Sequence, residues 1–232
     1  MRNKYFDDIS YVKTNIVQYL SNIFKVYGNE LLLRLEEYNL LQSENNCIES
    51  STATGFIMEE FITSKLEIYT KNHNRPNEIK IHKILGSTVA SSYDCYAEYK
   101  DIFIMINVKV EKNTSSNNAV SAINILYNDY VEKNPDKTKS YFILKTNYSF
   151  GKSATSDDKK ILVHNVDGYF LEQIDFSSGY EQDHRNWSSN FNGNSGRLRV
   201  TKKFFDNHKL EEKDISYKRT KEFINKIYQN NM

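Results

Sequence analysis

The chain has few of the residues that cross-link or interrupt a fold. Its 232 residues include two cysteines, two prolines and one tryptophan, and no run of eighteen apolar residues occurs. Cys47 and Cys95 lie far apart and form no Cys-x-x-Cys pair, so neither a disulfide framework nor a thiolate zinc site is indicated. The lack of a long apolar run argues against a membrane-spanning helix, and the N-terminus has no signal-peptide apolar core.

A large excess of either charge is also absent. The 31 basic and 30 acidic side chains leave a net charge of +1, which by itself argues neither for nor against nucleic acid. The charges are unevenly distributed, because residues 184–232 hold 11 basic and only 5 acidic side chains. This segment predicts a phosphate-binding face, although a solvated helix face over residues 218–226 accounts for part of it.

The remaining composition is that of a globular domain. Hydrophobic residues make up 39% of the chain, and the mean hydropathy is −0.67. We therefore expect one domain over residues 1–232, located in the cytoplasm and in contact with no membrane. Gly151-Lys152-Ser153 resembles the end of a phosphate-binding loop, but Thr146 stands where that loop needs glycine. We expect no nucleotide cofactor.

Apolar periodicity predicts alternating helices and strands. Helical spacing occurs in two segments of residues 9–41, in 53–69 and in 117–131; strand patterns cover 79–84, 89–96, 102–110, 141–148 and 169–174. A hairpin turn is expected at Tyr99-Lys100-Asp101. A strand, a crossover helix and a returning strand imply a parallel pair. The predicted fold class is α/β, with a central mixed β-sheet flanked by helices.

Four polar positions stand out against this background. Asp94 falls on the first strand of the hairpin, while Asn107 and Lys109 bracket Val108 on an otherwise apolar second strand. Because side chains alternate along a strand, Asn107 and Lys109 should face one side and Val108 the other. On the preceding helix, Glu59 borders the apolar stripe whereas Glu60 points more toward solvent.

These residue types suit phosphodiester hydrolysis with Mg²⁺. Mg²⁺ prefers hard oxygen ligands, which the carboxylates of Asp94 and Glu59, the amide oxygen of Asn107 and the main-chain carbonyl of Val108 would supply. Lys109 would orient or deprotonate the attacking water and stabilise the developing charge. The alternative is an edge strand whose outward face happens to carry Asn and Lys.

The order of these residues resembles the PD-(D/E)XK nuclease superfamily, and most closely its type II restriction endonucleases. Segments with this likeness span about two thirds of the chain: Thr54-Gly-Phe-Ile-Met-Glu-Glu-Phe-Ile62, Ile106-Asn-Val-Lys109, Asn117-Asn-Ala-Val120 and Ser195-Gly-Arg-Leu-Arg-Val200. The resemblance implies a restriction-endonuclease-like core over about 53–175, followed by a basic DNA-contacting part over about 184–232. Asp94, Lys109, Asn107 and Glu59 would be catalytic.

The sequence departs from the superfamily pattern at two positions. Tyr93 replaces the usual proline before the first acid, and Asn107 replaces the usual Asp or Glu two residues before the lysine. A neutral amide at position 107 weakens the attraction for a metal ion, so Glu59 becomes more important as a source of negative charge.

The C-terminal third and the residues after the catalytic strand mix cationic, amide and aromatic groups, as base and phosphate contacts require. The predicted DNA-binding residues are Lys112, Asn117, Asn118, His184, Arg185, Asn190, Asn192, Asn194, Arg197, Arg199, Lys202 and Lys203. An ordinary polar loop followed by a basic strand is the alternative here.

The sequence thus predicts a type II restriction endonuclease that cuts double-stranded DNA with Mg²⁺. A homodimer is expected, because two-fold symmetric DNA is most simply read by a two-fold protein. Two alternatives stay open. One is a nuclease of the same fold that acts in repair or junction resolution, and the other is a catalytically inactive DNA-binding or interaction module.

Overall fold

A computed structural model of the protein describes residues 4–32, 51–72, 78–84, 91–113, 118–152, 159–174, 180–183, 196–201 and 216–232. The helices are α1 (Lys4–Val26), α2 (Ser51–Asn72), α3 (Ile123–Tyr127) and α5 (Tyr217–Gln229), with a π-helix at Asn128–Glu132 and a 3₁₀ helix at Leu171–Gln173. The strands are β1 (Glu30–Leu32), β2 (Lys80–Lys83), β3 (Cys95–Tyr99), β4 (Ile102–Lys112), β5 (Ala119–Ala122), β6 (Thr138–Lys152), β7 (Lys159–Phe170), β8 (Tyr180–Asp183) and β9 (Arg197–Val200).

The strands form a six-stranded sheet in the order β1-β7-β6-β4-β3-β2 and a three-stranded sheet in the order β5-β9-β8. β4 and β6 run parallel, as the strand–crossover–strand pattern predicts, and the other neighbours in the large sheet are antiparallel. The β3–β4 hairpin turns at Lys100, which adopts a positive φ of 53°. The α/β class and the mixed sheet are therefore confirmed.

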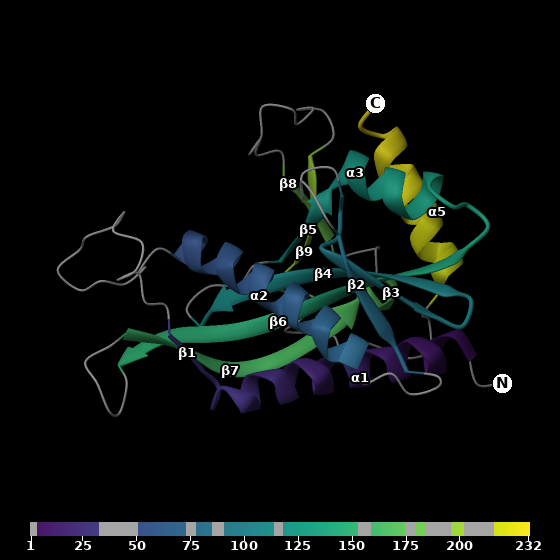
Figure 1. The fold of residues 1–232 in the computed structure, drawn as a ribbon. Helices are drawn as coiled ribbons and strands as arrows, with labels where there is room; N and C mark the ends of the chain where they lie inside the picture. Colours follow the sequence, from purple (N-terminus) through teal and green to yellow (C-terminus); the bar gives the residue numbers. More distant parts are fainter. Residues whose placement is uncertain are drawn as a thin grey trace.

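Helices cover both faces of the large sheet, as Figure 1 shows: α1 and α2 lie on one face, and α3 and α5 pack together on the other. Along β4, Ile104, Ile106 and Val108 join the core beneath α1 and α2, while Met105 joins the core beneath α3 and α5. A strand buried on both faces needs a near-continuous apolar sequence. This explains why residues 102–110 are almost entirely apolar.

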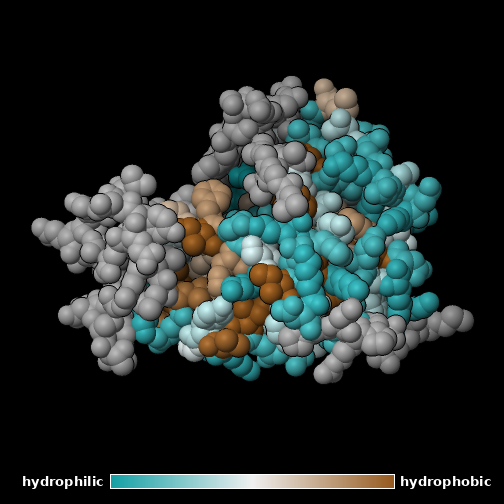
Figure 2. Space-filling view, in the orientation of Figure 1, coloured by the Kyte–Doolittle hydropathy of each residue, from teal (hydrophilic) through white to brown (hydrophobic). Residues whose placement is uncertain are grey.

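Helix α2 lies over the strands near the predicted site. Met58, Ile62 and Leu66 are fully buried beneath it, as its helical spacing predicts. Ile57 is an apolar residue next to Met58 in the sequence, but its side chain is 40% exposed, as is most of the neighbouring Phe56. Hydrophobic atoms are visible on the surface around this helix in Figure 2, whereas the face over α3 and α5 is mostly hydrophilic. The buried stripe is thus narrower than the sequence indicates.

In the predicted strand 89–96 the described residues 91–94 precede β3, so Asp94, predicted on that strand, lies just before it. Three further predicted elements differ from the structure. Leu31 and Leu32 lie in β1 rather than in a second helix, because they pair with β7. The predicted helix 117–131 begins instead with β5, which pairs with β9, and becomes helical only at Ile123. The predicted strand 169–174 is the end of β7 followed by the 3₁₀ helix. Sheet pairing between distant segments outweighed local periodicity in the first two cases.

Among the described residues, none of the helices combines the length and the apolar character needed to cross a bilayer. Cys95 is a buried free thiol in the core, as its small apolar side chain suggests. Cys47 lies outside the described residues.

The core beneath α3 and α5 contains a fully buried carboxylate at Glu172. It accepts hydrogen bonds from the Tyr130 hydroxyl, from Ser140 Oγ at 3.2 Å and from the Tyr141 amide at 3.1 Å. Burial raises the pKa of Glu172 from 4.5 to about 7, and the hydrogen bonds limit the rise. Between pH 4.5 and about pH 7, Glu172 therefore keeps its proton in the folded protein and loses it in the unfolded chain.

We therefore expect the free energy of unfolding to fall as pH rises from about 4.5 to 7, with Glu172 contributing about 3 kcal/mol to that fall. Replacement Glu172→Gln should flatten the decrease, while Glu222→Gln on the exposed face of α5 should leave it unchanged. Urea denaturation at several pH values measures both. An unchanged pH slope in the Glu172 variant would show that this carboxyl titrates normally.

Candidate active site

The predicted site lies where the β3–β4 hairpin separates. β3 pairs with β4 only from Ile102 to Ile106, whereas β4 continues to Lys112 alongside β6. Among the described strands, the part of β4 beyond Ile106 therefore pairs only with β6, and its other edge is open. Helix α2 contacts both β4 and β2 and so passes this open edge.

Asp94 directly precedes β3 and makes two of the hydrogen bonds that a longer β3 would make with β4. Its amide donates to the Ile106 carbonyl at 2.9 Å, and its carboxylate Oδ2 accepts from the Val108 amide at 2.7 Å. Desolvation raises the pKa of Asp94, while the Lys109 ammonium and the Val108 hydrogen bond lower it. The N–H and C=O of one strand residue point the same way, so the Val108 carbonyl also faces this edge.

Glu59 reaches the same place from α2. Burial raises its pKa to about 7, the Lys109 ammonium lowers it, and the Asp94 carboxylate raises it. Neighbouring Glu60 lies in a different environment: its side chain is 68% exposed and pairs with Lys83. The prediction that Glu59 lies at the stripe edge and Glu60 points to solvent is confirmed.

Lys109 is the cation of the cluster, since it affects the pKa of both carboxyl groups. In the β4–β6 register it lies opposite Lys145, so the two lysines share a face of the sheet. Two residues further along β4, the buried Glu111 pairs with Lys145 at 2.7 Å. A second lysine is thus held beside Lys109 by a desolvated carboxylate.

Asn107 is buried, with 5% of its surface exposed, and faces away from the core that Val108 joins. Its Nδ2 group lies within hydrogen-bond distance of three acceptors, which share its two hydrogens: the Ser92 carbonyl at 2.8 Å, the Val120 carbonyl at 3.0 Å and the Tyr141 hydroxyl at 2.8 Å. Because carbonyl groups only accept, these contacts fix which end of the amide is nitrogen.

The orientation of Asn107 leaves its Oδ1 atom on the opposite side, buried and without a hydrogen-bond partner among the described residues. An unsatisfied buried oxygen costs about 1–3 kcal/mol. That cost disappears if a water or a cation binds there. The nitrogen of Asn107 therefore has a structural task, while its oxygen remains available as a ligand.

The residues at this edge fit Mg²⁺, which typically binds one or two carboxylates and keeps several waters. Asp94 and Glu59 would supply the carboxylates, and Asn107 Oδ1 and the Val108 carbonyl would supply neutral oxygens. Within the described ranges, no group of three or more His, Cys, Asp or Glu side chains offers a metal site. A site here therefore depends on the amide and main-chain oxygens as well as on the acids.

The described DNA-contact candidates lie in three places. Lys112 ends β4, with its ammonium 5.2 Å from the centre of the Phe150 ring. Asn118 is 6% exposed, and its carbonyl accepts from the Val200 amide, so little of it is available to a ligand in this structure. Arg197 and Arg199 lie on β9, in register with Asp183 and Glu181 of β8.

The other predicted DNA contacts lie outside the described residues, and their positions stay predictions. They are Asn117, His184, Arg185, Asn190, Asn192, Asn194, Lys202 and Lys203.

Sequence reasoning missed the residues that hold this edge together. The backbone carbonyl of Ser92 accepts hydrogen bonds from the Asn107 and Tyr141 side chains, and its backbone amide donates to the Asp129 carboxylate. Tyr141 and Asp129 are 34 and 22 positions from Asn107, on different elements, so no local pattern connects them. One available signal was the Asp129 carboxylate within an apolar helical segment, which burial would require to be paired.

No family model matches the chain, and no curated protein matches it either. The geometry of the described residues therefore has to support any functional assignment. The likeness to PD-(D/E)XK nucleases stays a resemblance in motif and in the order of elements.

The Asn107 contacts predict that the usual acid of the motif is not tolerated at this position. Asn107→Asp would place a carboxylate against the carbonyls of Ser92 and Val120, and we expect a loss of about 2–4 kcal/mol in unfolding free energy at neutral pH. The matched control is Asn113→Asp at the exposed residue that directly follows β4, which should change stability by less than about 0.5 kcal/mol. Equal stabilities of the two variants in urea denaturation would disprove the amide orientation.

Proposed function

We propose that this protein is a Mg²⁺-dependent endodeoxyribonuclease that cuts double-stranded DNA at the edge of β4. The observation that carries the proposal is the convergence of Asp94, Glu59 and Lys109. They come from α2, from the segment that leads into β3 and from β4. The Asp94 carboxylate accepts from the Val108 amide, next to Lys109, and the Lys109 ammonium lowers the pKa of both carboxyl groups. An apolar cluster in place of two desolvated acids and one ammonium would often stabilise a fold equally well or better. Their grouping therefore favours chemistry.

Each residue has a task in hydrolysis. Asp94 and Glu59, with Asn107 Oδ1 and the Val108 carbonyl, would hold the metal ion. Bound Mg²⁺ would supply charge neutralisation at the phosphate and a more acidic water. Lys109 would orient the attacking water, and its positive charge would stabilise the phosphorane-like transition state. Lys145 lies opposite Lys109 on the same face, but its charge is balanced by the paired Glu111 carboxylate, so Lys109 is left as the cation of the proposed site.

The site-specific form of this activity is a type II restriction endonuclease acting as a homodimer. Support comes from the basic C-terminal segment, whose side chains would make phosphate contacts, and from the resemblance of the motif order to that group. One active site per subunit would cut one strand each. Digestion of a plasmid separates this from repair or junction activity, because only a restriction enzyme gives discrete bands.

Removal of the Asp94 carboxylate is the most direct functional test. Asp94→Ala should retain sequence-specific DNA binding in a gel-shift assay with Ca²⁺ and lose cleavage with Mg²⁺ by about 10³-fold or more. Unaltered cutting by this variant would remove the hypothesis. Absence of Mg²⁺-dependent cleavage by the unmodified protein would instead favour the inactive DNA-binding or interaction module.

The two adjacent glutamates of α2 provide a matched pair. Glu59→Gln removes a proposed metal ligand and should lower the cleavage rate by about 10–100-fold. Glu60→Gln alters an ion pair with Lys83 and a hydrogen bond from Ser64 at the surface, and should leave the rate within about twofold of the unmodified protein. Initial cleavage rates over a series of Mg²⁺ concentrations measure both. Equal rates for the two variants would exclude Glu59 from the site.

A further inference from the structure

We infer that Asp129 is a positioning residue for Asp94, and that it sets the geometry of the proposed metal site from a π-helix on the far side of the sheet edge. This inference rests on the proposed function. It names a residue that neither the motif nor the resemblance indicates.

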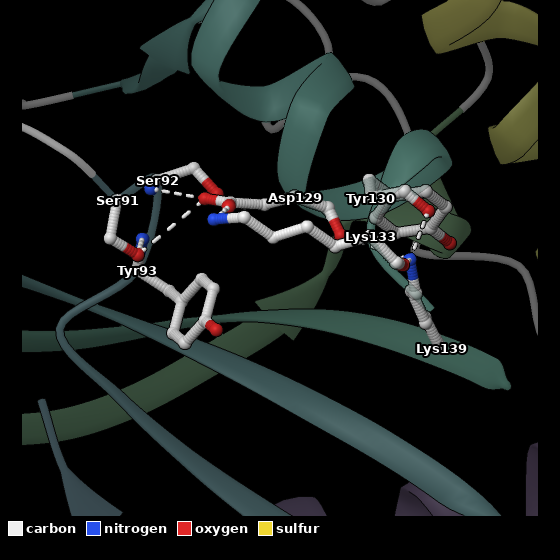
Figure 3. Close-up of polar contacts among 7 residues, drawn as sticks. All are labelled: Ser91, Ser92, Tyr93, Asp129, Tyr130, Lys133 and Lys139. Atoms are coloured by element: carbon white, nitrogen blue, oxygen red, sulfur yellow. Dashed lines mark hydrogen bonds and ion pairs between the residues drawn. The ribbon is translucent and has the colours of Figure 1, made fainter. Parts of the chain in front are cut away.

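The segment Ser91–Tyr93 leads directly into Asp94 and is held from two directions at Ser92. On one side, the Ser92 amide donates to Asp129 Oδ2 at 2.7 Å, and the Ser91 hydroxyl donates to the same oxygen at 3.5 Å. Figure 3 shows this carboxylate pointing at the segment from the helix. On the other side, the Ser92 carbonyl accepts from Asn107 Nδ2 and from the Tyr141 hydroxyl.

Asp129 is itself firmly fixed. Its side chain is only 1% exposed, and its second oxygen pairs with Lys133 at 2.6 Å. The turn that carries it is closed by the buried Lys139, whose ammonium donates to the carbonyls of Asp129, Tyr130 and Lys133 (Figure 3). A lysine that satisfies three carbonyls at a helix end stabilises that end. The carboxylate is thus presented by a rigid element.

The π-helical geometry of Asn128–Glu132 is a second reason to assign Asp129 a functional role. Such helices are rare and occur frequently at functional sites, because the wider turn shifts side chains from their α-helical positions. Here the element directly follows α3, and it places a buried acid against a backbone amide 37 residues away in the chain. Burial of a carboxylate costs free energy unless the group is paired, so a helix that served only to fill the core would carry an apolar residue at this position.

The consequence for Asp94 follows from chain connectivity. With the Ser92 peptide held at both its amide and its carbonyl, only one residue separates the fixed point from Asp94. The Asp94 carboxylate is then anchored again by the Val108 amide. One of its oxygens is occupied by that bond, and the other has a restricted position from which to bind a metal ion. Loss of the Ser92 contact would release this restriction.

The test compares Asp129→Ala and Asp129→Asn with Glu132→Gln, a change at an exposed position of the same π-helix. A second variant, Tyr141→Phe, removes a hydroxyl from the other side of Ser92 with little change in buried volume. Three quantities are measured for each folded variant: Mg²⁺ and Ca²⁺ affinity by calorimetry, hydrogen exchange at the Ser92 and Val108 amides, and kcat and KM for DNA cleavage.

For Asp129→Ala we expect metal affinity and kcat to fall by about 10–100-fold with little change in KM, and exchange at Ser92 and Val108 to accelerate. Asp129→Asn retains an acceptor for Ser92 and should recover much of the loss. Tyr141→Phe should shift metal affinity and Val108 exchange in the same direction by a smaller factor, and Glu132→Gln should shift neither.

Metal affinity and Val108 exchange unchanged in both Asp129→Ala and Tyr141→Phe would overturn the inference while leaving the proposed function intact. A drop in melting temperature alone, with unchanged metal affinity, would assign Asp129 a purely structural role and also overturn it. Failure of the unmodified protein to bind Mg²⁺ and to cut DNA would overturn the proposed function, and the inference with it.

Discussion

The hydrogen bond from the Val108 amide to the Asp94 carboxylate determines how the candidate site is built. β4 continues past its partner β3, and the carboxylate stands in for the strand that is no longer there. One interaction therefore completes the backbone of a buried strand and places an acid at an open sheet edge. Glu59 and Lys109 approach the same edge, where the Lys109 ammonium lowers the pKa of both carboxyl groups against the rise that burial causes.

The grouping of Asp94, Glu59 and the Asn107 oxygen lowers the stability of the fold, and this cost suggests that a ligand binds there. Two acids with raised pKa values and an amide oxygen with no partner are gathered within a small, largely desolvated region. Buried groups that are only partly satisfied weaken a fold unless a ligand completes them. Next to this region, the backbone amide and carbonyl of Ser92 are both hydrogen-bonded, to Asp129 and to Asn107 and Tyr141. Within the part of the chain that the structure describes, the amide oxygen of Asn107 is the partnerless buried atom that lies on the strand carrying Lys109.

Sequence alone predicted the features that depend on local pattern. Alternation along β4 correctly placed Asn107 and Val108 on opposite faces, and helical spacing correctly distinguished Glu59 from Glu60. It failed where distant segments pair: Leu31 and Leu32 form a strand with β7, and residues 119–122 form one with β9. It also missed the structural use of Asn107, because the carbonyls that its amide bridges belong to Ser92 and Val120, on separate elements.

The location of a bound divalent cation tests the central claim most directly. Crystals grown with Mn²⁺ in place of Mg²⁺ would reveal the ion by its anomalous scattering. The account predicts an ion at the open edge of β4, liganded by Asp94 and Glu59 with the oxygen of Asn107 or Val108 beside it. Mn²⁺ bound only elsewhere, or absent from this edge at concentrations that support DNA cleavage, would contradict it.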